Sequence, residues 1–413
     1  MGIEQGSYRT LIVAALAIVL SAPAIASAKV SFIPIPEIVT SPNEGNTLGL
    51  LAVFLFLDEK DEIRYMIAPD AVYNPTKGFM ANFRLFGYPT PTRRYSVVIG
   101  KSTTKDEDYE LEFTDRGFWE GRAFVLASVV HERDSTERFF GFGNDSPQRE
   151  CHPGERFPEC GESNYTNNDT VAQATPGVWL LPYVNLNYRM RIRRYGVDEG
   201  QVDKLAFTGE AHPEARGRGL DTGVIWAHQT ALVYDTRDAT DIPQKGALAL
   251  VYGEFTDRRL GSTTSFIKFG TEGRKFVPIR DGNPIIAGRV LFDYTSGSHD
   301  TPFWEMSSLG GRRTLRGFGS DRFIDFNRSL ASIEVRTRVY QRHIFGVNAE
   351  IELAPFVETG KVFPHVRDSP VNHLHWVGGL GFRGIVRPQI VGFVDVGYGA
   401  EGSAIFTGVD YPF

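Results

Sequence analysis

The chain has 413 residues, a formal net charge of −6 and a mean hydropathy of −0.21. This weakly acidic balance offers no basic surface for nucleic acid, so we expect no nucleic-acid partner. Beyond residue 28 no apolar run is long enough to cross a bilayer as a helix, which excludes a helical membrane protein. The modest hydropathy does not exclude a membrane β-barrel, because barrel strands alternate lipid-facing apolar residues with polar residues that face the lumen.

Residues 1–28 have the layout of an export signal. A positive charge precedes an unbroken apolar run over residues 11–20, and Ala26 and Ala28 occupy the small-residue positions that signal peptidase requires. An uncleaved membrane helix is the alternative, but it needs about 20 apolar residues, twice the length of this run. We therefore predict cleavage after the signal and a mature barrel domain over residues 29–413.

The mature chain consists of short segments in which polar and apolar residues alternate between turn residues. Residues 332–340 show this most clearly, because Ile333 and Val335 would face one side while Glu334 and Arg336 face the other. A period of two predicts strands rather than helices. A soluble β-sandwich shows the same alternation, but the number and length of the segments favour a barrel.

Bacterial single-chain barrels use even strand numbers, so we predict about sixteen strands and leave the position of the first strand open. The predicted strands begin near residues 62, 77, 92, 107, 120, 165, 183, 222, 246, 262, 285, 328, 347, 374, 389 and 402, with a further possible strand at 45–57.

The connections between these strands alternate in length. Residues 341–343 and 387–388 would be tight turns, whereas residues 132–164, 197–221 and 296–327 would be long loops. Outer-membrane barrels have short periplasmic turns and long extracellular loops. The predicted fold is therefore all-β, a transmembrane antiparallel β-barrel.

Two cysteines, Cys151 and Cys160, lie in the first long loop. In an exported chain they are expected to form a disulfide. A zinc site that includes His152 is the alternative, but it would lack a fourth ligand. Loop acids such as Asp145 and Asp169 do not have the regular spacing of a calcium loop. We predict no required metal and no cofactor.

The loop over residues 296–327 contains the most specific stretch, Gly310-Gly311-Arg312-Arg313-Thr314-Leu315-Arg316-Gly317-Phe318. It is a glycine-flanked turn that presents three arginines and one aromatic side chain. It could be a solvated loop tip. It could also be a plug that inserts Arg316 into a polar lumen, where the guanidinium would need a carboxylate partner.

The C-terminus places a glycine and two aromatic residues, Gly408, Tyr411 and Phe413, at the spacing seen in outer-membrane strands. In such strands the terminal rings lie at the membrane interface. Pro412 departs from this pattern because it removes a ladder donor, and Phe406 stands where a polar residue is usual. We predict that Gly408, Tyr411 and Phe413 form a C-terminal outer-membrane signal.

Several stretches resemble the superfamily that contains the BamA and TamA outer-membrane assembly factors and the bacterial surface antigen barrels. Leu315 to Phe318 is similar to its RGF/RGY loop motif, and residues 356–360 are similar to its Phe-x-Asp-x-Gly strand motif with Glu358 in the acidic place. The resemblance implies an extracellular loop that folds into the barrel and an ion pair between Arg316 and Glu358.

Three more stretches are similar to the same superfamily in matching order. They are residues 234–246, residues 139–146 and residues 379–413. The assembly factors carry periplasmic POTRA domains, but here only about 17 to 30 residues separate Lys29 from the first predicted strands. We therefore expect a barrel-only member.

The resemblance implies a barrel, integral to the bacterial outer membrane, that assists insertion or translocation of proteins there. Its partners would be unfolded client proteins or a separate periplasmic subunit. Its surroundings would be outer-membrane lipid and lipopolysaccharide, and its own biogenesis would use periplasmic chaperones and the barrel-assembly machinery. A plugged or gated pore, or a structural envelope protein without assembly activity, is the alternative.

The mechanism proposed for this superfamily opens a seam between the first and last strands, whose unpaired N–H and C=O groups can template an incoming strand. Gly402, Gly408 and Pro412, near the last strand, would weaken such a seam. Ordinary glycines at the tapering end of a barrel are the alternative interpretation.

A barrel hydrolase is a more remote alternative. His131 is close to Glu132 and Asp134, and His373 and His375 would share one face of a strand. However, no nucleophile elbow of the G-x-S-x-G type occurs in the chain. We predict that the protein is not an enzyme.

Overall fold

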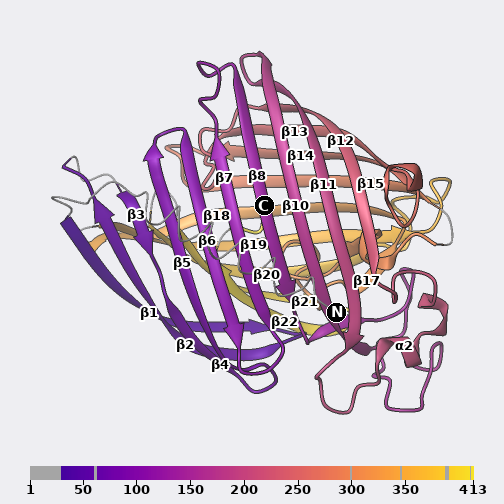
Figure 1. Ribbon diagram of the computed structural model, residues 1–413. Helices are drawn as coiled ribbons and strands as arrows, with labels where there is room; N and C mark the ends of the chain where they lie inside the picture. Colours follow the sequence, from indigo (N-terminus) through magenta and orange to yellow (C-terminus); the bar gives the residue numbers. More distant parts are fainter. Residues whose placement is uncertain (1–28, 60–62, 298–299, 345–346, 387–389, 410) are drawn as a thin grey trace, which may run out of the picture.

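The computed structural model describes residues 29–59, 63–297, 300–344, 347–386, 390–409 and 411–413. The predicted export signal (1–28) and the predicted tight turn at 387–388 lie outside the described residues. One antiparallel sheet of 20 strands forms the described barrel wall, and β16 and β17 form a separate two-stranded sheet (Figure 1). None of the helices in the described part of the chain is long and apolar enough to span a membrane.

Neighbouring strands of the wall pair in antiparallel register. The wall strands are β1 (Lys29–Ser41), β2 (Gly45–Leu57), β3 (Ile63–Ile67), β4 (Asp70–Asn74), β5 (Gly78–Thr90), β6 (Arg93–Ser102), β7 (Glu107–Asp115), β8 (Ala123–Arg133), β9 (Glu137–Phe139), β10 (Ser163–Leu181), β11 (Val184–Glu199), β12 (Gly223–Asp235), β13 (Gly246–Thr256), β14 (Phe266–Pro278), β15 (Ile285–Gly297), β18 (Asn327–Ile344), β19 (Val347–Phe363), β20 (His375–Val386), β21 (Ile390–Gly399) and β22 (Gly402–Val409).

The remaining elements lie in the connections. They are β16 (Ser307–Leu309), β17 (Phe323–Asp325), α2 (Thr208–Ala211) and the 3-10 turns η1 (Pro213–Ala215), η2 (Arg258–Leu260) and η3 (Phe303–Glu305).

The predicted antiparallel barrel is confirmed, and each of the sixteen predicted strand starts falls within four residues of an observed one. The predicted number of strands is nevertheless too low. The segment expected near residue 62 is divided into β3 and β4, β9 is an additional short strand, and β1 and β2 form an additional hairpin. The possible strand at 45–57 is therefore present as β2.

The expected linker before the first strand is also absent, because β1 begins at Lys29. Pro34 and Pro36 made a strand in this segment difficult to predict, since proline lacks the N–H that a central strand needs. The predicted turn at residues 341–343 is wrong as well, because these residues continue β18.

The long connections gather at one end of the barrel, around α2, and we call this the loop end (Figure 1). Because each strand crosses the wall once, the connections over residues 134–162, 200–222, 300–326 and 364–374 lie at this end. Short connections such as residues 182–183 lie at the opposite end, which we call the turn end.

Alternation along the strands gives the wall an apolar outer face and a polar lumen. Ile333 is 50% exposed on the outside, whereas its neighbour Glu334 is fully buried on the lumen side. Val290 and Phe269 are likewise exposed on the outer face, at 59% and 53%. This is the pattern of a wall that faces lipid outside and polar groups inside.

The hydrophobic core lies inside the barrel, where the connection over residues 300–326 meets the wall. Its members are Leu291, Leu309, Leu315, Phe318, Phe323, Leu330, Phe356, Val362 and Val377. Four of these nine side chains come from the connection itself, so apolar packing holds that segment in the lumen.

Candidate functional site

The connection over residues 300–326, which we call the inner loop, folds into the lumen and turns back as a hairpin. β16 and β17 form its stem, with Ser307 opposite Asp325 and Leu309 opposite Phe323. The tip of the hairpin carries Arg316. The structure thus places the RGF-like stretch inside the barrel and not at a solvated loop tip.

Arg316 is fully buried and its guanidinium contacts three carboxylates. Its Nε donates to Glu358 Oε1 at 3.0 Å, and its Nη1 donates to Glu334 Oε2 at 3.0 Å and to Asp395 Oδ2 at 2.7 Å. Its backbone N–H donates to Glu358 Oε2 at 2.7 Å. The guanidinium also lies over the ring of Phe356, 3.5 Å from the centroid. Glu358 is the partner expected from the sequence, whereas Glu334 and Asp395 are additional.

Two further arginines complete what we call the arginine cluster: Arg316, Arg336, Arg383, Glu334, Glu358 and Asp395. Arg336 Nε donates to Glu334 Oε1 at 2.8 Å, and Arg383 donates to Asp395. Three positive and three negative side chains therefore balance one another where each is at most 1% exposed. Removal of one partner from such a buried group leaves an uncompensated charge.

Glycines allow the tip of the inner loop to approach β21. A Cβ atom at Gly397 would lie 2.1 Å from the carbonyl oxygen of Arg316, and a Cβ at Gly317 would lie 2.9 Å from the backbone N of Gly399. Because both distances are too short for a side chain, only glycine permits this contact. Gly317 in the RGF-like stretch and Gly397 in β21 are therefore both needed for the same close contact between the two backbones.

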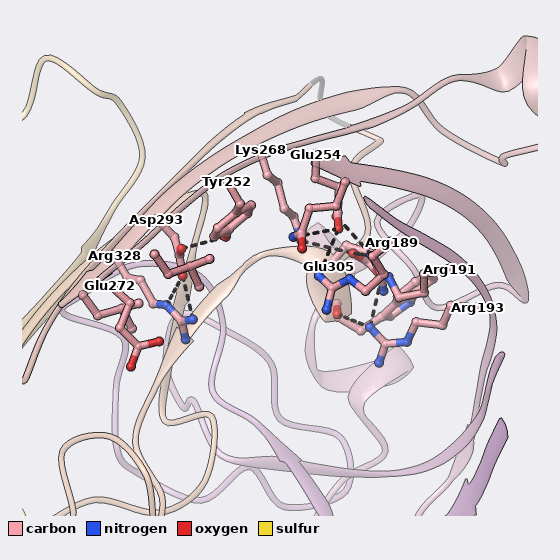
Figure 2. A pocket seen from close by; sticks show the side chains of 14 residues that line it. Arg189, Arg191, Arg193, Tyr252, Glu254, Lys268, Glu272, Asp293, Glu305 and Arg328 are labelled. Carbon is pink, nitrogen blue, oxygen red and sulfur yellow. Dashed lines mark hydrogen bonds and ion pairs between the residues drawn. The ribbon is translucent and has the colours of Figure 1, made fainter. Parts of the chain in front are cut away.

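A second charged contact fixes the other side of the inner loop (Figure 2). The carboxylate of Glu305, in η3, accepts hydrogen bonds from Arg191 at 2.7 and 2.9 Å, from Arg193 at 3.1 Å and from Lys268 at 3.1 Å. Its side chain is 1% exposed. The inner loop therefore offers an arginine to an acidic part of the wall and a glutamate to a basic part.

Burial alone would raise the pKa of the Glu305 carboxyl, but Arg191, Lys268 and Arg193 together hold this pKa well below its usual range. The ionised carboxylate therefore stabilises the folded state at pH values above the unfolded-state pKa of about 4.3. This stabilisation is lost as the pH falls toward the lower pKa that Glu305 has in the folded state. We expect the gap in heat-unfolding midpoint between wild type and Glu305→Gln to be constant from about pH 5 to 8 and to narrow below about pH 4. Gel mobility after heating measures both midpoints, and an equal gap at pH 3 and pH 7 would contradict this assignment.

The stretch over residues 139–146 covers the inner loop at the loop end. Gly143 N donates to the carbonyl of Ile324 at 2.8 Å, and Asn144 Oδ1 accepts from the N–H of Val362 at 3.1 Å. His375 Nε2 also donates to the backbone carbonyl oxygen of Asn144, at 2.9 Å. The stretch that resembles a family motif therefore serves to hold the inner loop in place.

The histidines considered for a hydrolase lie in different surroundings. His375 stacks on Phe323 in the lumen, with ring centroids 4.0 Å apart. His131 Nδ1 lies 2.8 Å from Thr170 Oγ1 on the β8–β10 wall, and Asp134 pairs with Lys77 at 2.7 Å. The structure does not bring these groups into one site.

Cys151 and Cys160 are joined by a disulfide and are fully buried beside Ala206 and Ala211. Their sulfur atoms are therefore not free to bind zinc with His152. Across the described ranges, no group of three or more histidine, cysteine, aspartate or glutamate side chains is arranged to hold a metal ion.

The C-terminal aromatic residues lie inside the barrel and not at the membrane interface that their spacing suggested. Tyr411 and Phe413 are each 6% exposed. Arg336 lies over the Tyr411 ring, 4.0 Å from the centroid, and its Nη2 donates to the Phe413 carbonyl at 3.1 Å. The reason is the buried guanidinium, which offers both rings a cation–π contact in the lumen. Gly408 lies on β22 opposite Phe393.

The first and last strands, β1 and β22, meet at a seam that lacks a backbone ladder in the described residues. Within the described ranges, one side chain joins them: Thr407 Oγ1 accepts from the N–H of Thr40 at 2.8 Å and donates to the carbonyl of Ile38 at 2.7 Å. The other junctions between neighbouring strands have backbone ladders, so in the described part of the chain this seam has fewer hydrogen bonds than they have.

Two prolines explain why the seam is weak. In an antiparallel strand, alternate N–H groups point to the same edge. The N–H of Thr40 points toward β22. The backbone groups of residues 34 and 36 therefore face β22 as well, and both residues are proline. Proline has no N–H to donate. The missing donors therefore belong to β1, whereas the weakness expected from the sequence lay near the last strand.

The inner loop crosses the seam at the loop end and contacts both sides of it. In the β1–β2 turn, Asn43 Oδ1 accepts from Ser320 N at 3.0 Å and Asn43 Nδ2 donates to Ser320 O at 3.2 Å. In the β21–β22 turn, Glu401 accepts from Arg322 at 2.7 Å. We call Asn43, Ser320, Arg322 and Glu401 the clasp. It links the two edges of the seam through the inner loop.

Comparisons with known proteins agree with this architecture. A model of the Omp85 superfamily domain matches residues 93–374. The fold is similar to BamA from Haemophilus ducreyi lacking POTRA domains 1–3, with 13% identity, a TM-score of 0.55 and coverage of 96% of this chain and 78% of that one. CdiB from Escherichia coli is similar at 10% identity and a TM-score of 0.48, with 92% of this chain and 66% of that one covered. No curated protein matches the chain.

Proposed function

The chain belongs to the Omp85 superfamily, and we propose that it assists insertion or translocation of proteins at the bacterial outer membrane by opening the seam between β1 and β22. The observation that carries this proposal is the seam itself, where Thr407 is the one bridge between the two strands among the residues that the structure describes. The resemblance to the outer-membrane assembly factors supports it. The export signal before residue 29 and the outer-membrane location are parts of the same proposal.

Opening the seam would expose the edge of β1 to an incoming strand. The carbonyl of Ile38 and the N–H of Thr40 would lose their Thr407 partner and become available for pairing. An extended segment of an unfolded client can add to such an edge through main-chain hydrogen bonds. Pro34 and Pro36 would leave a gap in that pairing, so a nascent strand could be released again.

The clasp supports a regulated seam, because the inner loop would have to release Asn43 or Glu401 before the loop end could separate. We expect the double variant Asn43→Ala, Glu401→Gln to increase hydrogen exchange of the β22 amides by about thirtyfold, since Asn43→Ala removes two hydrogen bonds that contribute about 1 kcal/mol each. Mass spectrometry of the folded protein in detergent measures this exchange.

Asn283→Ala is a matched control for that variant. Asn283 makes the same pair of amide-to-backbone bonds, to the backbone of Arg338 at 2.9 and 2.8 Å, but it does so at the turn end between β15 and β18. Equal exchange of β22 in the clasp variant and this control would contradict a role of the clasp at the seam.

The proposed function is tested by reconstituting the folded protein in liposomes and measuring membrane insertion of an unfolded small barrel protein. We expect insertion at least about tenfold faster than in empty liposomes, the scale on which a catalysed step stands out. No acceleration, together with steady ion conductance, would favour the alternative of a pore. No acceleration and no conductance would favour a structural envelope protein.

A further inference from the structure

A cavity of about 380 Å³ lies in the lumen beside Glu305, between the inner loop and the wall (Figure 2). Five cationic side chains line it: Arg189, Arg191 and Arg193 on β11, Lys268 on β14 and Arg328 on β18. The three arginines of β11 are two residues apart, so all three side chains face the lumen. The volume is in the range of protein ligand sites.

Glu305 occupies the basic part of this cavity as a ligand would. Three cations from two strands donate four hydrogen bonds to its carboxylate. It belongs to the inner loop, whereas the other acidic lining residues, Glu254, Glu272 and Asp293, belong to wall strands. The inner loop therefore supplies the carboxylate to a receptor that the wall provides.

The wall of this cavity is positively charged without the inner loop. Five cationic lining residues then face the three acidic residues of the wall strands. In the described residues, the Nε atoms of Arg189 and Arg191 are buried and have no hydrogen-bond partner. Buried guanidinium groups with unused donors favour an additional acceptor.

The residue before Glu305 indicates what kind of carboxylate fits. The indole of Trp304 stacks on Tyr195, with ring centroids 4.7 Å apart, and the Arg193 guanidinium lies 5.0 Å from the centroid of the indole ring. The wall thus receives an aromatic residue and an acidic residue that are adjacent in a polypeptide. Free phosphate or a lipid headgroup would use only the cationic half of this surface.

We propose that this cavity is a binding site for an acidic segment of a polypeptide, in which Glu305 is an internal occupant that an incoming carboxylate replaces when the inner loop moves. This inference rests on the proposed function, for which it names a substrate class: client segments that carry a carboxylate beside an aromatic residue. Binding at this site would favour release of the inner loop, because both occupants compete for Arg191, Arg193 and Lys268.

The test uses the full-length protein in detergent and a dye-labelled peptide, Phe-Trp-Glu flanked by glycines, whose binding is followed by fluorescence anisotropy. Glu305→Ala empties the carboxylate position, and we expect it to lower the Kd for this peptide by about tenfold or more relative to wild type. The same peptide with glutamine in place of glutamate should not gain affinity. The double variant Glu305→Ala, Arg191→Gln should lose the gain.

Asp70→Ala is the matched control, because Asp70 is also a buried carboxylate paired with an arginine, Arg84, but it lies on β4 and does not line the cavity. Equal gains in Glu305→Ala and Asp70→Ala, or equal binding of the glutamate and glutamine peptides, would overturn the proposal, since either result means attraction by overall charge. The absence of any gain in Glu305→Ala would overturn it as well.

Folding and function are checked separately. If Glu305→Ala does not show the folded gel mobility, Glu305→Gln replaces it with the same two peptides and the same outcomes. Because binding is measured without client insertion, wild-type protein that accelerates insertion while Glu305→Ala gains no affinity would overturn only this inference. Peptide binding without acceleration would overturn only the proposed function.

Discussion

Arg316→Ala is expected to lower the free energy of unfolding by about 3 to 5 kcal/mol, the cost of breaking a buried ion pair. Glu334, Glu358 and Asp395 would remain buried with two arginines in place of three. The tip of the inner loop would also lose the backbone hydrogen bond that Glu358 accepts, because its register depends on the guanidinium. Heating in detergent followed by gel mobility measures the unfolding midpoint.

Arg316→Lys should fall between wild type and the alanine variant. A lysine keeps the charge but cannot contact three carboxylates and the Phe356 ring at the same time. Arg367→Ala is the control, because Arg367 is exposed in the connection between β19 and β20. A midpoint in Arg316→Ala that equals the midpoint in this control would show that the arginine cluster does not stabilise the inner loop.

The barrel wall was predictable because its signal is local. Alternation at a period of two needs only neighbouring residues, so each predicted strand start lies close to an observed one. β1 was not predicted, and β2 was predicted only as a possible strand, for a physical reason. Pro34 and Pro36 are unfavourable inside a sheet, and β2 is apolar over nearly its whole length, with little alternation to detect.

The candidate site was predictable only where a motif carried it. Leu315 to Phe318 and Glu358 were identified through resemblance, and the structure places Arg316 against Glu358. Asp395 lies in a stretch that resembles the last strands of the superfamily, but that resemblance did not indicate its partner in a loop 79 residues away. Glu334 was correctly placed on the polar face of its strand. The alternation that places it there does not indicate that Arg316 is its partner.

The Glu305 contact and the clasp gave no signal in the sequence. Glu305 meets Arg191 across 114 residues, and Ser320 meets Asn43 across 277 residues. Each of these residues looks like an ordinary polar loop residue when read alone. Their roles follow from the path of the inner loop through the lumen, which depends on tertiary packing and on the glycines of β21 that admit the loop tip.

Locking the seam is expected to abolish the proposed activity. A cysteine pair at Thr40 and Thr407, joined by a short thiol crosslinker, would fix β1 to β22 at the point where the Thr407 side chain now joins them. An incoming strand could then no longer reach the edge of β1. The control is a pair at Val396 and Ile405, which face each other in register on β21 and β22 and do not span the seam.

The most direct test of the seam is therefore insertion of an unfolded small barrel protein into liposomes that contain either crosslinked variant. We expect the barrel locked at Thr40 and Thr407 to lose about tenfold or more of the acceleration, and to regain it when a cleavable crosslinker is cut, while the Val396–Ile405 control stays as fast as wild type. Insertion at the wild-type rate through a barrel whose seam is fully crosslinked would contradict the account.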